Sequence, residues 1–260
     1  PPDLWRRAAR LRRRLEVRRT QRAVDRLLAA RGPLAAGTAE VVVYFPDGAV
    51  NLYQLRQWYE PLRHLARTHP VVIVTRTAHA THAALRESAL PVVQLRRIGD
   101  YEAWLATQRV RAVLYVNQNV RNFSALRFAE PAHVFISHGE SDKAYMASNQ
   151  AKAYDHVLVA GQAAVDRLER AVVGIDPARL VPIGRPQLDV EHEAPALPAD
   201  GRTVVLYAPT WEGDRPSMSY SSVASHGHQM VAALIATGRH RVIYRPHPRT
   251  GLVDRAHARA

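Results

Sequence analysis

Three segments of the chain place histidine, arginine or threonine where a buried strand is expected to end. The first is Ser137-His138-Gly139-Glu140-Ser141-Asp142-Lys143, after a predicted strand at 133–137. A histidine suits general base chemistry because its unperturbed pKa lies near neutral pH. Gly139 permits an unusual backbone angle or the close approach of a ligand, and a helix starting after Asp142 would direct backbone N–H groups at an anion. The alternative is that His138 only caps the strand through a backbone hydrogen bond.

The second segment, Tyr244-Arg245-Pro246-His247-Pro248, follows a predicted strand at 241–244. Its two prolines fix the backbone around His247 and remove two N–H donors. An arginine and a histidine projecting from this turn would suit a ligand that carries phosphate, because guanidinium binds phosphate through two parallel hydrogen bonds. The structural alternative is a rigid turn with solvent-exposed side chains.

The third segment, Tyr207-Ala208-Pro209-Thr210-Trp211-Glu212-Gly213, follows a predicted strand at 203–208. The Thr210 hydroxyl could bond a phosphate, and Trp211 could stack on a base or pack in the core. Gly161 follows another predicted strand and opens a helix, so we include it with the donor- or phosphate-binding candidates, although a close-packed turn explains it equally well.

The elements that would position these residues alternate between strand and helix. Seven short runs rich in Val and Ile are predicted strands: Val41–Phe45, Val71–Thr75, Pro91–Leu95, Ala112–Val116, His133–Ser137, His156–Ala160 and Leu180–Gly184. Between them lie helical patterns, such as Leu55–Thr68, His79–Ser88, Tyr101–Gln108 and Gly161–Val173. Strands that are apolar on both faces and separated by helices indicate a buried, doubly wound parallel sheet.

The pattern breaks at 190–202, a polar stretch with two prolines that reads as a linker, and restarts at 203. It predicts a strand at 203–208, a helix at 223–237 and a strand at 241–244. We therefore expect an α/β protein with a first Rossmann-like lobe at 40–189 and a second at 203–260. The chain starts at Pro1 and the last strand has nothing after it to complete its lobe, so we expect a fragment whose second lobe is incomplete.

Residues 1–31 predict a basic helix ahead of the first lobe. They hold eleven arginines and three acidic residues, a net charge of +8 out of +13 for the chain, and their leucines recur at helical spacing. Three interpretations remain open: a solvated helix docked on the body, a helix on an anionic membrane surface, and a nucleic-acid-binding arm. The last is the weakest, since no aromatic residues or nucleic-acid motif accompany the arginines, and we expect no nucleic acid partner.

Composition excludes several kinds of site. The chain has no cysteine, which rules out disulfides, thiolate metal ligands and a cysteine nucleophile. No run approaches the roughly 18 apolar residues that span a bilayer. The remaining histidines show no convincing metal spacing, and the phosphate-binding loop, the dinucleotide fingerprint and the Gly-x-Ser-x-Gly elbow are missing. We predict no metal and no cofactor.

Taken together, three stretches resemble the CDP-glycerol glycerophosphotransferase family, which makes teichoic-acid-type poly(glycerol phosphate). They are His138-Gly139 with Lys143 and Tyr154-Asp155, Val205–Trp211, and Arg245–Pro248. The resemblance covers roughly Val41 to Pro248 and implies a GT-B arrangement of two Rossmann-like lobes. It also implies a transferase that moves glycerol phosphate from CDP-glycerol to a hydroxyl of a lipid-linked polyanionic acceptor and releases CMP. Such an enzyme would lie at the cytoplasmic face of the membrane, with residues 1–31 near anionic lipid.

By the same resemblance, His138 matches the motif histidine proposed as the base on the acceptor side, where Gly139 and Lys143 also belong. His247 matches the second motif histidine, on the donor side. Two features depart from the family: Glu212 stands where an arginine often follows the tryptophan, and the sequence ends at Ala260, before the Ser/Asp-rich donor motif of many members could appear. We expect the fragment itself to be inactive.

Two other functions remain open. One is a GT-B glycosyltransferase or epimerase that uses a nucleotide sugar, which donor preference would reveal. The other is a non-catalytic cell-envelope scaffold or binding protein, whose function would survive loss of His138 and His247.

Overall fold

A computed structural model describes the chain except residues 1, 142, 144–145, 191–196, 215 and 255–260. The described residues form two compact units, the first from 2–141 with 146–190 and the second from Lys143 with 197–254. The helix predicted to start after Asp142, most of the linker predicted at 190–202 and the end of the chain fall at least partly on residues outside those described.

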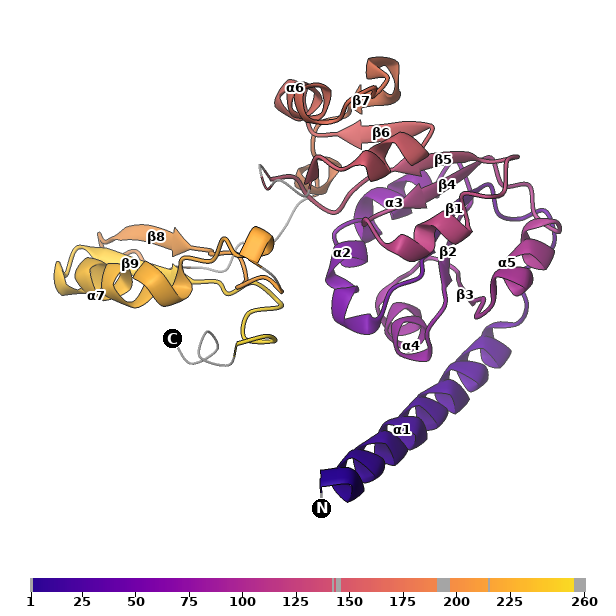
Figure 1. Cartoon of the computed structure of the whole chain (residues 1–260), viewed down its shortest axis with the longest axis horizontal. Helices are drawn as coiled ribbons and strands as arrows, with labels where there is room; N and C mark the ends of the chain where they lie inside the picture. The colour runs from indigo at the N-terminus through magenta and orange to yellow at the C-terminus, as the bar shows by residue number, and fades with distance from the viewer. Residues whose placement is uncertain (1, 142, 144–145, 191–196, 215, 255–260) are drawn as a thin grey trace. The chain divides into compact units, whose positions relative to one another are not determined.

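The first unit is built on a seven-stranded, fully parallel sheet, which confirms the predicted α/β class (Figure 1). Its order is β3-β2-β1-β4-β5-β6-β7. The strands are β1 (Val41–Phe45), β2 (Val71–Thr75), β3 (Val92–Gln94), β4 (Ala112–Tyr115), β5 (Ala132–Phe135), β6 (His156–Val159) and β7 (Leu180–Pro182).

Helices cover both faces of this sheet. They are α2 (Tyr53–Arg56), α3 (Tyr59–Leu65), α4 (Ala78–Glu87), α5 (Ile98–Leu105) and α6 (Gln162–Ala171). Successive side chains of β1 enter opposite cores: Val43 packs with residues of α2, α3 and α4, whereas Val42 and Tyr44 pack with α5 and α6 residues. Because successive side chains of a strand point to opposite faces, an all-apolar strand needs a helix layer on each side.

The strand order reverses between β1 and β4. From β1 the chain adds β2 and β3 on one side, and from β4 it adds β5, β6 and β7 on the other. In open α/β sheets the crevice at such a switch point, outside the carboxyl ends of the strands, is where ligands bind. The residues that follow β1, β4 and β5 are therefore the ones to examine.

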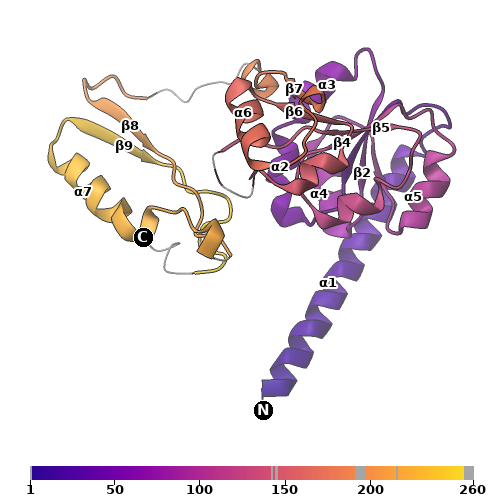
Figure 2. The same ribbon diagram turned by 45° about the horizontal axis from the view of Figure 1, so that its top comes forward.

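Helix α1 (Pro2–Arg31) begins the chain and extends away from the sheet (Figures 1 and 2). Its C-terminal part packs on α4, with Val24 fully buried and Arg31 donating to the Leu85 carbonyl at 2.6 Å. Residues 6–19 are exposed throughout, a length of ~21 Å at the helical rise. They carry eight arginines and one acidic residue.

The second unit pairs two parallel strands, β8 (Thr203–Tyr207) and β9 (His240–Tyr244), with α7 (His228–Ala236). On β8, Val204 and Leu206 are 45% and 59% exposed. A parallel sheet is ordinarily covered on both faces, so within the described residues this lobe is smaller than a complete Rossmann-like lobe.

Most predicted elements differ from the structure by a few residues at their ends, and two of the predicted helices differ in type or continuity. The helix predicted over Leu55–Thr68 is two short helices, because the chain turns between α2 and α3 to bury Trp58. The helix predicted at 223–237 begins with a π-helical turn, Val223–Gly227, before α7. The strand predicted to reach Ser137 ends at Phe135.

Candidate active site

His138 lies just beyond the carboxyl end of β5, held by a distinctive turn. Ser137 before it has a φ of 53°, in the left-handed region that few residues other than glycine adopt. The buried indole N–H of Trp58 donates to the Ser137 carbonyl, and the Ser137 hydroxyl donates to the Gly139 carbonyl at 2.8 Å. These contacts over-determine a strained residue, an arrangement that is often found at functional sites.

The turn fixes the protonation pattern of the His138 ring. Its Nδ1 lies 3.2 Å from the Val116 carbonyl oxygen at the end of β4. A carbonyl oxygen can only accept a hydrogen bond, so Nδ1 carries the proton and Nε2 of the neutral ring carries the lone pair. Tyr53 packs edge-on against the ring, with centroids 6.0 Å apart at 88°. This is the tautomer that a general base acting through Nε2 requires.

Gly139 does not have the unusual backbone angle that its residue type suggested. The positive φ in this segment belongs to Ser137, and a Cβ built on Gly139 meets no atom within 4 Å. Of the two roles expected for Gly139, the unusual backbone angle falls instead on Ser137, whose carbonyl accepts from the indole of Trp58. The close approach of a ligand stays a prediction.

Sequence analysis missed a polar cluster at the β1–β4 switch point. Asp47, two residues after β1, accepts hydrogen bonds from the Asn117 side chain (3.1 Å), the Asn51 side chain (2.9 Å) and the Gly48 backbone (2.7 Å). The Asn117 amide also donates to Gln54 at 2.7 Å. Asp47 and Asn117 also follow strand ends, as His138 does, but their importance depends on the strand order, which the sequence does not give.

Gly161 lies at the start of α6 in the first unit. The other predicted phosphate-binding residues, Thr210, Trp211 and Arg245, belong to the second unit. The Gly161 φ of 172° is ordinary extended backbone. The backbone N–H of Ala160, next to it, donates to the Glu140 carboxylate at 2.5 Å, and Glu140 also lies 3.6 Å from the Arg167 guanidinium. A protein carboxylate therefore already binds at this helix start.

In the second unit, Thr210 is in contact with Lys143. The Lys143 ammonium donates to the Thr210 hydroxyl at 2.6 Å and lies 5.8 Å from the centroid of the Tyr220 ring. Burial lowers the pKa of Lys143. The structure thus groups Lys143 with Thr210, a predicted donor-side residue, rather than with Gly139.

Trp211, His247 and Arg249 form a stack beyond β8 and β9. The rings of Trp211 and His247 are 6.3 Å apart at 22°, and the Arg249 guanidinium lies 3.8 Å from the centroid of Trp211, a cation–π distance. The His247 Nδ1 accepts from the Arg249 backbone N–H at 3.1 Å, which puts the proton of a neutral ring on Nε2. Arg245 is exposed and precedes His247 by two residues in the sequence. Its backbone N–H donates to the Tyr207 carbonyl.

Glu212 is buried, with 7% exposure, and holds the loop that follows Arg249. Its carboxylate accepts from the backbone N–H groups of Gly251 (3.1 Å), Val253 (3.0 Å) and Asp254 (3.2 Å). Burial favours a raised pKa, but backbone hydrogen bonds outweigh it and lower the pKa of Glu212 to about 2. The next residue, Gly213, has a φ of 77°, and a Cβ there would lie 2.4 Å from a backbone oxygen. Glu212 is therefore an internal anion bound by a loop.

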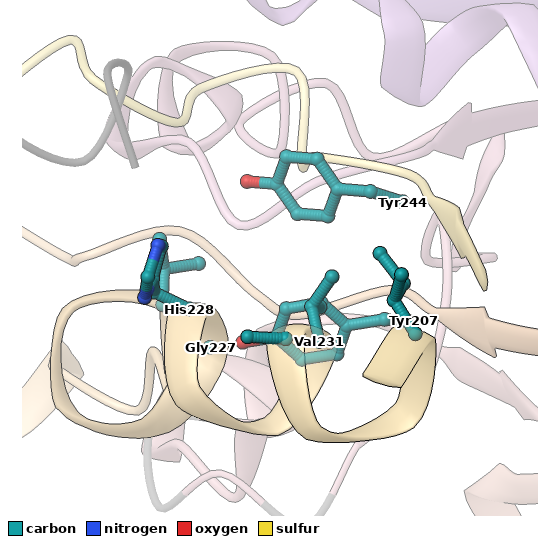
Figure 3. Close-up of a pocket in the computed structure, with 8 residues that line it drawn as sticks. Tyr207, Gly227, His228, Val231 and Tyr244 are labelled. Atoms are coloured by element: carbon teal, nitrogen blue, oxygen red, sulfur yellow. The ribbon is translucent and has the colours of Figure 1, made fainter. Parts of the chain in front are cut away.

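A cavity of about 250 Å³ opens between α7 and the ends of β8 and β9. Figure 3 shows Tyr244 on one side and Gly227, His228 and Val231 of the helical segment on the other. The lining is mainly apolar, and none of the sequence-predicted residues contributes to it. It lacks the cations that a phosphate group needs.

Within the described residues, no group of three His, Asp or Glu side chains could hold a metal ion. The same part of the chain contains no helix that is long and apolar enough to cross a membrane.

These features define an α/β protein with a Rossmann-like first unit, a smaller parallel second unit, and a histidine at a strand end in each. No protein-family profile and no curated protein matches the chain. A solved structure of the wall teichoic acid polymerase TagF is similar at a TM-score of 0.48 and 10% identity, over 94% of this chain and 65% of TagF. A TagF variant gives 0.48 and 12%, over 95% and 66%.

A glycosyltransferase from Rickettsia africae ESF-5 is similar at a TM-score of 0.41 and 11% identity, over 83% of this chain and 70% of that one. The chain spans about two thirds of the length of TagF. Identities this low concern the fold and assign no activity.

Proposed function

We propose that the chain is the catalytic region of a transferase that moves glycerol phosphate from CDP-glycerol to a hydroxyl of a teichoic-acid-type acceptor. The observation that carries the proposal is the opposite hydrogen bonding of Nδ1 in the two motif histidines. Nδ1 of His138 faces the Val116 carbonyl and donates a hydrogen bond to it, which leaves the lone pair of the neutral ring on Nε2. His247 accepts at Nδ1, which leaves the proton on Nε2. One ring is prepared to take a proton and the other to donate a hydrogen bond.

The reaction needs one group of each kind. The acceptor oxygen attacks the phosphorus that bears glycerol, and its proton passes to Nε2 of His138. The bond between that phosphorus and the bridging oxygen breaks, CMP leaves with the bonding electrons, and a new phosphodiester remains. Such transfers depend on positioning and on stabilising negative charge spread over the phosphate oxygens. The Nε2–H of His247 would bind one of these oxygens.

Cations and a hydroxyl of the second unit serve the donor phosphates in this proposal. Arg245 supplies an exposed guanidinium, and Lys143 with Thr210 supplies an ammonium and a hydroxyl. Trp211 offers an aromatic face for stacking. Gly161 stays a predicted phosphate-binding residue and is not needed for this proposal; the neighbouring Ala160 N–H binds Glu140. The reaction as written uses no metal and no cofactor.

The exposed part of α1 provides the proposed contact with the membrane. Residues 6–19 form a strongly cationic helix with few contacts to the body. Anionic lipid attracts such segments by about 1 kcal/mol per Lys or Arg near the surface. A peripheral location at the cytoplasmic face would keep the enzyme beside a lipid-linked polyanionic acceptor.

The test is CMP release from CDP-glycerol with a lipid-linked glycerol phosphate acceptor, using the protein with the whole of its reading frame. We expect His138→Ala and His247→Ala each to lower the rate by about 100-fold or more, within the range for a lost proton-transfer group. His64→Ala, at an exposed histidine of α3, is the matched control and should leave the rate unchanged.

Other outcomes would reject the proposal in different ways. Nucleotide release from a UDP-sugar, without release from CDP-glycerol, would assign the protein to the glycosyltransferases. Full activity in both histidine variants would remove the proposed roles. Inactivity with every donor, despite intact folding and a broad range of acceptors, would favour a non-catalytic envelope protein.

A further inference from the structure

Asn117, just beyond the carboxyl end of β4, makes several hydrogen bonds to other side chains. Asn117 is 6% exposed and uses both protons of its amide, one for Asp47 after β1 and one for Gln54 in α2. The backbone carbonyl of Asn117 accepts a hydrogen bond from the fully buried Asn122 side chain at 2.7 Å. The side-chain amide of Asn122 also donates to the Tyr154 hydroxyl at 3.1 Å. Asp47, Gln54 and Asn122 therefore all hydrogen-bond to Asn117 at the switch point.

Two residues that contact the His138 ring are neighbours in the chain of this network. Val116, whose carbonyl binds the His138 Nδ1, immediately precedes Asn117. Tyr53, which packs edge-on against the His138 ring, immediately precedes Gln54. A single amide thus restrains the hydrogen-bond acceptor of the imidazole and the ring that supports its orientation.

We propose that Asn117 is a positioning residue that fixes the orientation and the tautomer of His138. The inference rests on the proposed function, because it assigns Asn117 a role in the work of His138 as a base. A neutral imidazole that loses its carbonyl partner can put the proton on Nε2, and the base then has no lone pair there. Groups that orient a catalytic or metal-bound histidine in this way typically contribute 10–100-fold to activity or affinity.

The chemistry also explains why this residue is an amide. The Asp47 carboxylate can only accept, so its neighbour must donate. An aspartate at 117 would put two carboxylates about 3 Å apart, which disfavours ionisation of both. Exchanging the two side chains, Asp47→Asn with Asn117→Asp, restores one donor and one acceptor across the switch point. Gln54 can match the exchange by turning its amide, since it carries both a donor and an acceptor.

The experiment measures the tautomer and the kinetics of the same variants. Nitrogen-15 NMR of the imidazoles reports the tautomer, with the His138 signals assigned by their loss in His138→Gln. We expect the Nδ1–H form in the native protein and a clear shift towards Nε2–H in Asn117→Ala. CMP release should show kcat lowered by roughly 10–100-fold with KM changed less than about twofold. The exchange variant should recover most of both signals relative to Asn117→Asp.

Asn149→Ala, at an exposed asparagine, is the matched control for folding and should change neither measurement. An unchanged His138 tautomer in a folded Asn117→Ala variant would overturn the proposal, as would an exchange variant no better than Asn117→Asp. A tautomer shift in a protein that never turns over CDP-glycerol would retain the positioning role and reject the proposed reaction. Turnover of CDP-glycerol that depends on His138 but not on Asn117 would retain the proposed reaction and reject the positioning role.

Discussion

Replacing Glu212 by glutamine tests how the second unit builds its strand-end loop. The carboxylate binds three backbone N–H groups, at 251, 253 and 254, with a chain separation of about forty residues. Glutamine keeps the size of the side chain and one acceptor oxygen, but it has no charge, and its Nε2 would point donor hydrogens at one of the backbone donors. The variant therefore removes one hydrogen bond and weakens the other two without creating a cavity.

The expected magnitude follows from the number of bonds and their exposure. A hydrogen bond to a charged group contributes roughly 1.5–3 kcal/mol. Residues 252–254 are exposed, so water replaces part of the loss, and we expect about 2 kcal/mol for the set rather than the full sum. Because 1.4 kcal/mol is a factor of ten in an equilibrium constant, local opening of the loop should become about 30-fold more frequent.

The pH dependence has a definite sign. The pKa of Glu212 falls from 4.5 to about 2 on folding, so its contribution is fully present above about pH 4.5. It is lost as the pH falls towards 2, because the unfolded loop binds the proton more readily. In Glu212→Gln this part of the pH dependence disappears.

Hydrogen exchange of the amides at 251, 253 and 254 measures both effects. The native protein should lose protection at these amides between about pH 4.5 and 2, and Glu212→Gln should show lower protection near pH 6 without this pH dependence. Glu102→Gln, at an exposed glutamate of α5, is the control. Equal protection in the native protein and in Glu212→Gln near pH 6 would refute the argument that the carboxylate holds the loop.

Two other perturbations address the turn before His138 and the N-terminal helix. Trp58→Phe leaves the buried Ser137 carbonyl without its indole donor, so chemical denaturation should show a loss of about 1–3 kcal/mol; a change below about 0.5 kcal/mol would contradict the role given to the indole. Deleting residues 1–19 leaves the packed part of α1 in place, so the unfolding midpoint should not change, while salt-sensitive binding to anionic vesicles should be lost. Undiminished vesicle binding by the truncated protein would reject α1 as the membrane contact.

The strands of the first unit could be predicted from the sequence because their side chains are apolar on both faces. Val41–Phe45 is an example, predicted and observed with the same bounds. The helix predicted over Leu55–Thr68 failed because tertiary contact overrides propensity. Trp58 reaches a carbonyl 79 residues away, and the chain breaks the helix to let it do so.

The candidate site was predictable only where it depended on residue type. His138 and His247 stand out in any strand-end segment, but Asp47 and Asn117 gain meaning from the strand order. A sequence predicts that β1 and β4 exist, and it does not say that they are neighbours. Glu212 looked like a departure from a motif because its partners lie in a loop about forty residues further on.

The two units differ in electrostatic character, and this difference supports the division of labour between them. The strand ends around His138 present amides and two carboxylates that are already bound: Asp47 accepts from three donors, and Glu140 accepts from the Ala160 N–H. Neutral hydroxyls suit such surroundings better than anions do. The strand ends around His247 carry Arg245 and Arg249, and the only carboxylate described in contact with that loop, Glu212, is turned inward on backbone N–H groups. A nucleotide diphosphate would find cations there, whereas beside Asp47 it would meet a like charge. The proposed acceptor therefore belongs with the first unit and the proposed donor with the second, for a reason that rests on charge and not on the motifs.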